Sequence, residues 1–173
     1  QILTLAKKYR DILKSRFPSG KIVQVDFVSL EPRVAMKIAG HDTSEDVYEV
    51  VNREMFSSSL NRAQVKLAVL CALYGASVHR LTKMIGKTFP VQKKIRQIKD
   101  YFGVKDILLT ARECERAKRP FCNYFGRELQ VKGSQANMIV SHFIQSTGVD
   151  VAMLGFYDII QRIKRANLNA LPI

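Results

Sequence analysis

The spacing of apolar positions predicts a helix, a strand and a second helix in the early part of the chain. Residues 3–16 carry apolar side chains on one side of an amphipathic helix, and the segment Pro18–Gly20 then breaks the chain. The next segment, Lys21–Val28, is short and β-branched, which predicts a strand. A helix is expected from about Leu30, and Gly40 ends it.

Beyond that point the pattern predicts helices almost throughout. They are expected at Ser44–Arg53 with a Ser cap, at 60–74, at 90–102 and at Lys105–Arg116. Residues 121–131 are typical of a hairpin around Gly126. A long helix closes the chain, and its apolar face consists of Val149, Ala152, Met153, Phe156, Ile160 and Ile163. The predicted fold class is α+β, predominantly α, and the 173 residues are within the size of one domain.

Charge is concentrated in the middle of the sequence. The chain has 28 Lys and Arg against 15 Asp and Glu, a net charge of +13. Residues 61–132 hold 16 of the basic and 5 of the acidic side chains, so nearly all of the surplus lies there. This distribution favours a face that binds a polyanion, most simply nucleic acid or nucleotide. A solvated, lysine-rich surface is the alternative.

Cysteine spacing and hydropathy give information about the cellular compartment of the protein. The three cysteines are far apart and have no zinc-binding spacing, which predicts a reduced, intracellular protein. No apolar run approaches the roughly 18 residues of a membrane span. The first residue is Gln1 rather than Met, which predicts a processed start or a piece of a longer chain.

Two segments carry candidate chemistry. Arg62, Lys66, Leu70 and Tyr74 are spaced by four, so on a helix they form one stripe about 18 Å long. Two cations at its start could hold a triphosphate, and the apolar and aromatic residues could meet sugar and base. The alternative is an ordinary amphipathic helix with solvated cations and a core tyrosine.

The second segment lies at the predicted strand-to-helix junction. Asp26 falls at the end of an apolar strand, where an unpaired carboxylate is costly and a metal ion would relieve the cost. Glu31 follows at the start of the helix. The alternative is that Asp26 caps a turn and that the negative charge of Glu31 interacts favourably with the helix dipole.

Together these patterns resemble the family A DNA polymerases, the bacterial polymerase I-like and phage enzymes. Asp26–Arg33 (Asp-x-x-x-x-Glu-x-Arg) is similar to their first palm motif, and Arg62–Gly75 (Arg-x-x-x-Lys, then Tyr-Gly) to their fingers motif. Gln145–Asp150 is similar to a further palm segment, Gln-Gly-Thr-Ala-Ala-Asp. The resemblance covers the chain from about residue 21 to its end.

The resemblance implies a helical fingers subdomain inserted in a partial palm. Residues 1–40 would be the palm segment with the first catalytic motif, 41–132 the fingers, and 133–173 palm helices that stop before the second catalytic motif. The implied activity is template-directed transfer of a deoxynucleotide from dNTP to a primer 3′-hydroxyl by a two-ion Mg²⁺ mechanism. The implied partners are primer–template DNA and the rest of the polymerase, in the cytoplasm or nucleoid, or in the host cytoplasm if the source is viral.

The resemblance also assigns roles to residues. Asp26 would be a catalytic, metal-binding carboxylate, joined by the backbone carbonyl of Phe27. Glu31 would exclude a ribose 2′-hydroxyl and pair with Tyr74. The remaining roles are triphosphate binding by Arg62 and Lys66, with Lys66 a proton donor to pyrophosphate, sugar contact by Leu70, base contact by Tyr74 and Gly75, and DNA contact by Arg33 and Gln145.

The chain also departs from the family pattern. Leu70 replaces a usual Phe or Tyr, Ser29 a usual Gln, and Tyr48 a usual His, while Ser146 and Gly148 alter the later palm motif. The second catalytic carboxylate, part of a His-Asp pair in the family, has no matching motif, so the chain alone is expected to be inactive. Two explanations stay open, a piece of a longer polypeptide or one subunit of a split polymerase. A non-catalytic, basic nucleic-acid-binding module is the alternative function.

Overall fold

The protein is predominantly helical, as the periodicity predicts. A computed structural model describes residues 6–75, 78–86 and 89–170. Its elements are the 3₁₀ helix η2 (Lys7–Ile12) and the α-helices α1 (Leu30–Ile38), α2 (Val47–Phe56), α3 (Arg62–Tyr74), α4 (Val78–Ile85), α5 (Val91–Tyr101), α6 (Val104–Arg116) and α7 (Ala136–Arg165). None of the helices in the described ranges is long and apolar enough to cross a membrane.

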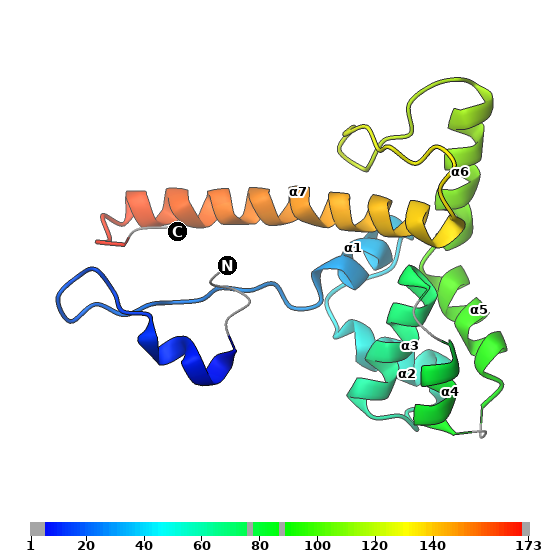
Figure 1. Ribbon diagram of the computed structural model, residues 1–173, viewed down its shortest axis with the longest axis horizontal. Coiled ribbons are helices and arrows are strands. Elements are labelled where there is room, and N and C mark those ends of the chain that lie inside the picture. Colours follow the sequence, from blue (N-terminus) through cyan, green and yellow to red (C-terminus); the bar gives the residue numbers. More distant parts are fainter. Residues whose placement is uncertain (1–5, 76–77, 87–88, 171–173) are drawn as a thin grey trace.

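The longest helix, α7, organises the arrangement in space. It runs across the whole molecule, with α1 beside it, α2–α5 gathered in a lobe on one side and α6 standing across it (Figure 1). The first half of α7 contacts this helical lobe, whereas residues 6–28 run out beside its second half (Figure 1). One buried core joins the helical lobe to α1, α6 and the first half of α7, and the second half of α7 projects away from it.

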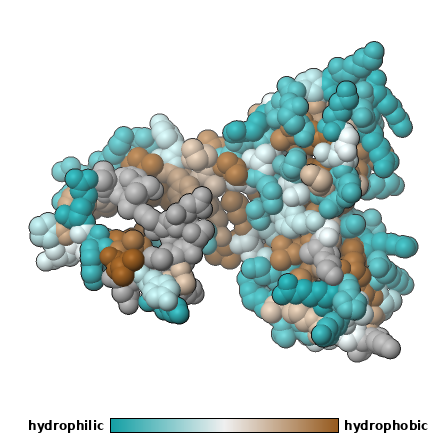
Figure 2. Space-filling view, viewed as in Figure 1, coloured by the Kyte–Doolittle hydropathy of each residue, from teal (hydrophilic) through white to brown (hydrophobic). Residues whose placement is uncertain are grey.

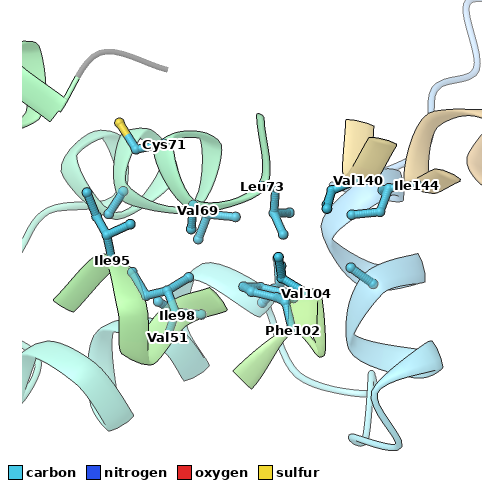
Figure 3. Packing of buried hydrophobic residues seen from close by; sticks show 14 of the residues in the cluster. Val51, Val69, Cys71, Leu73, Ile95, Ile98, Phe102, Val104, Val140 and Ile144 are labelled. Carbon is cyan, nitrogen blue, oxygen red and sulfur yellow. The ribbon is translucent and has the colours of Figure 1, made fainter. Parts of the chain in front are cut away.

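Helix α3 is the centre of the lobe and contacts α2, α4, α5 and α7. It begins with a capping box, in which the Asn61 side chain accepts from the Gln64 N–H and the Gln64 side chain accepts from the Asn61 N–H. Its apolar residues belong to the buried core, and Figure 3 shows Val69 and Leu73 in one cluster with Phe102. Burial on several sides fixes the direction in which the remaining face of α3 points.

The predicted strand Lys21–Val28 is wrong for this structure. Residues 21–27 have no regular secondary structure, and no β-sheet forms within the described ranges. A strand needs a neighbouring strand to pair its backbone N–H and C=O groups, and no described residue forms a strand beside this segment. Its β-branched residues stay at least half exposed instead; they are Ile22, Val23, Val25 and Val28.

Other boundaries differ in detail. Asp46 rather than Ser44 caps α2, and the early helix is reduced to η2 among residues 6–16. The predicted hairpin is confirmed as a narrow one, with an antiparallel bridge between Cys122 and Glu128. Helix α4 was not predicted. The apolar face expected on the closing helix exists, but much of it is exposed.

Candidate nucleotide-binding site

Three sequence motifs that lie far apart in the chain meet where α1, α3 and α7 come together. Glu31 lies in the first turn of α1, and Tyr74 is the last residue of α3. Gly148 is buried on α7, and a β-carbon there would lie 3.5 Å from Cγ of Glu31. The Glu31 side chain therefore lies beside α7 at Gly148, with room for about one methyl group between them.

Tyr74 has an unused hydrogen-bonding group at this junction. Its hydroxyl is buried and has no hydrogen-bond partner in the part of the chain that the structure describes. Burial, followed by the charge of the nearby Glu31 carboxylate, raises the pKa of Tyr74 above its ordinary value. Tyr74 therefore stays protonated at neutral pH and keeps a donor available on the side of Glu31.

Gly75 is required by both conformation and space. It ends α3 with φ of 69°, in the left-handed region that favours glycine. A β-carbon there would lie 2.9 Å from Nδ2 of Asn137, in the first turn of α7. The end of α3 is thus held directly against the start of α7.

The predicted stripe on α3 changes from polar to apolar along the helix. Arg62 and Lys66 are exposed near the N-terminus, whereas Leu70 and Tyr74 are half-buried near the C-terminus. The N-terminal turns of a helix favour anions through their free N–H groups and the helix dipole. This order places two cations where a phosphate chain would be favoured, and less polar side chains about two to three turns away.

Arg62 has partners that the sequence did not predict. Its Nη1 donates to Oδ1 of Asp46 at 2.6 Å, and its guanidinium lies 4.8 Å from the centre of the Tyr48 ring. Asp46 also accepts from the backbone N–H groups of Tyr48 and Glu49 as the cap of α2. The guanidinium is therefore held near the start of α3, but an anionic ligand would have to compete with Asp46 for it.

This pair has an expected pH dependence. The hydrogen bond from Arg62 lowers the pKa of Asp46, despite the opposing effect of partial burial. A lowered folded pKa gives stability that is complete above the unfolded value of about 3.9 and is lost as the pH falls through the folded value. Asp46→Asn, which keeps a capping side chain, is expected to lower the free energy of unfolding by about 0.2–1 kcal/mol near pH 7.

The measurement is urea unfolding of wild type and Asp46→Asn across the acid range. The difference between the two should shrink toward zero as the pH falls through the lowered pKa of folded Asp46, since both side chains are then uncharged. Gln92→Ala provides a control, because Gln92 is an exposed, uncharged residue on α5. A difference between wild type and Asp46→Asn that stays constant with pH would show that the charge of Asp46 does not stabilise the fold.

The predicted metal ligands are only partly assembled. Asp26 is exposed in the segment before α1, and the ring of Phe27 packs on that of Phe156 with centroids 5.2 Å apart. No group of three or more His, Cys, Asp or Glu residues is placed to hold a metal ion within the described ranges. One carboxylate does not fit a two-ion site, which needs bridging ligands from more than one residue.

The two predicted DNA-contacting side chains occupy different surroundings. Gln145 is exposed on α7. Arg33 is half-buried and its Nη1 donates to the backbone carbonyl of Thr43, which ties α1 to the loop before α2. Arg33 and Gln145 thus lie on α1 and α7, the helices that carry Glu31 and Gly148.

Sequence reasoning missed a polar network beside this site. Asp150 accepts from the guanidinium of Arg127, and Nδ2 of Asn123 donates to the same carboxylate at 2.6 Å. Arg127 first, and Asn123 second, lower the pKa of Asp150. The available signal was the Asn123–Gly126 turn, whose asparagine is typical of a side chain that bonds its own backbone.

Comparison with protein-family models, with curated proteins and with solved structures finds no match to this chain.

Proposed function

We propose that this chain is the nucleotide-binding and partly catalytic region of a template-directed DNA polymerase of the family A type. The observation that carries the proposal is the meeting of Glu31, Tyr74 and Gly148 from three separate motifs. Those motifs were matched to polymerase segments by sequence pattern alone. Their convergence at one junction is the arrangement that a shared nucleotide site requires.

The stripe on α3 supplies the binding surface. Arg62 and Lys66 bind the triphosphate near the helix N-terminus, where the dipole adds to their charge. Lys66 also donates a proton to the departing pyrophosphate. Leu70 contacts the sugar, and Tyr74 with Gly75 contacts the base pair being formed.

Glu31 and Tyr74 together select the sugar. In the nucleotide-bound protein the Tyr74 hydroxyl, which has no partner among the described residues, donates to the Glu31 carboxylate, and the pair then fills the space that a ribose 2′-hydroxyl would need. Both residues are half-buried, and the Tyr74 hydroxyl itself is buried. A 2′-hydroxyl would therefore compete with a partly buried polar contact, which carries a free-energy cost.

The rest of the polymerase covers the exposed apolar face. This face consists of residues 21–28 and the second half of α7, where Met153 and Tyr157 are 64% and 63% exposed. Figure 2 shows hydrophobic side chains between the N-terminal segment and the helical lobe, where a covering partner would exclude water. Asp26 lies in the same segment, so the polypeptide that covers this face is placed to bring the second carboxylate and complete the Mg²⁺ site. It belongs to the same protein or to a separate subunit.

The test is Glu31→Ala in the whole protein that contains this chain. Incorporation of ribonucleotides relative to deoxynucleotides is expected to rise by about tenfold or more, since one unfavourable polar contact of about 1–3 kcal/mol is removed. Single-nucleotide primer extension with dATP or ATP measures the ratio. Glu49→Ala, an exposed substitution on α2, is the matched control. An unchanged ratio in Glu31→Ala would remove Glu31 from sugar selection.

The second candidate is a non-catalytic module that binds nucleic acid through phosphate contacts. The basic surplus of residues 61–132 favours it. Its binding would be indifferent to dNTP and would weaken uniformly with salt. Dependence of nucleotide binding on Lys66 separates the two functions.

A further inference from the structure

The hairpin at 121–131 has a tip that is fixed in place by buried polar bonds. Oδ1 of Asn123 accepts from the backbone N–H groups of Phe125 and Arg127, at 3.0 and 2.9 Å. Its Nδ2 donates to Asp150 of α7, and the side chain is buried. The strands close through hydrogen bonds from Asn123 N to Arg127 O and from Leu129 N to Phe121 O, both 2.8 Å.

Two aromatic side chains project from this fixed tip into solvent. Tyr124 is 67% exposed and Phe125 is 48% exposed. Their ring centres are 5.5 Å apart and their planes meet at 80°. Turn tips are usually polar, so two adjacent aromatics on an anchored turn indicate a contact surface rather than a solvated loop.

The segment that carries the tip is basic. Residues 116–132 contain five Lys and Arg and a single acidic residue, Glu128, and of these cations Arg127 is paired with Asp150 of α7. The exposed cations other than Arg127 are Arg116, Lys118, Arg119 and Lys132. The hairpin lies on the opposite side of α7 from the lobe of α2–α5 (Figure 1), away from the stripe on α3. Charge of this sign selects an anionic ligand over a neutral apolar partner.

We infer that the hairpin tip binds single-stranded nucleic acid by stacking Tyr124 and Phe125 on unpaired bases. Every base has a stackable face, and neighbouring cations follow the phosphates, so this combination binds single strands with little dependence on sequence. Perpendicular rings prevent both from stacking within one continuous column, so each ring takes a separate base. The site is distinct from the nucleotide stripe and needs neither dNTP nor Mg²⁺.

The test combines removal of the rings with removal of the bases. Wild type and the double variant Tyr124→Ala, Phe125→Ala are titrated with a fluorescent oligo-dT and with an abasic oligomer of equal length, and anisotropy reports the affinity. The variant is expected to lose about 5- to 150-fold in affinity for oligo-dT per stacked base. It should match wild type on the abasic oligomer, because the phosphate contacts are retained. The salt dependence of oligo-dT binding should be unchanged.

Two controls keep the result interpretable. Tyr9→Ala removes another exposed tyrosine, from η2, and should leave both affinities unchanged. The double variant Tyr124→Leu, Phe125→Leu keeps apolar side chains on the tip. Thermal unfolding checks that each variant is folded. Equal losses on oligo-dT and on the abasic oligomer, or no loss on either, would overturn the stacking role. That result would leave the nucleotide site unaffected, since no dNTP is present.

Discussion

The double variant Arg62→Ala, Lys66→Ala is expected to bind dNTP at least about 100-fold more weakly than wild type. Each cation makes a charge-assisted contact to phosphate worth about 1.5–3 kcal/mol, or about tenfold or more in affinity. Both side chains are exposed on α3, so their removal should not disturb its packing. Equilibrium titration of the whole protein with dATP and Mg²⁺, on a primer–template, measures the loss.

The matched control removes two cations from another helix. Lys105→Ala with Arg112→Ala on α6 changes the net charge equally, and both side chains are exposed. If affinity depends only on overall charge, the two double variants should lose it equally. That outcome, or unchanged dNTP affinity in the α3 variant, would contradict a triphosphate site on α3.

Phe102→Ala is expected to lower the free energy of unfolding by about 3–5 kcal/mol. Phe102 is 1% exposed and lies in the cluster that joins α3, α5 and α6 (Figure 3). Removing its ring leaves a cavity that rigid helices fill only in part. Since marginal domains have only about 5–15 kcal/mol in total, this loss would be a large share of their stability.

Urea unfolding followed by circular dichroism measures the difference. Leu109→Ala removes an exposed apolar side chain from α6 and should change stability by less than about 0.5 kcal/mol. Similar small losses in both variants would show that the cluster beneath α3 is not the core of the lobe. The α3 stripe would then have no rigid support.

Local periodicity was sufficient for most of the helices, but not for α4 or for the extent of the early helix. The residues of α3 and of α5 recur at helical spacing, and the structure confirms both within about two residues of the predicted ends. It failed for Lys21–Val28, because β-branched composition favours a strand only where another strand can pair with it. It also could not show that the apolar face of α7 would be exposed, since burial depends on what packs against a helix.

The candidate site likewise has features that the sequence could predict and features that it could not. The stripe from Arg62 to Tyr74 follows from one helix and was predictable from spacing alone. The contact of Arg62 with Asp46 was not, because it joins side chains 16 residues apart that are separated by α2 and the loop after it. The closeness of Glu31 and Tyr74 was implied by the resemblance to polymerases and by no spacing within the chain.

Template-directed incorporation by the protein purified from its native source tests the central claim most directly. A labelled primer annealed to a template is incubated with one dNTP at a time and Mg²⁺, and extension is followed on a denaturing gel. The account predicts extension only with the dNTP complementary to the template base, and loss of extension in Asp26→Asn. Incorporation that ignores the template, or none at all from a protein that binds the primer–template well, would contradict the polymerase assignment and favour the binding module.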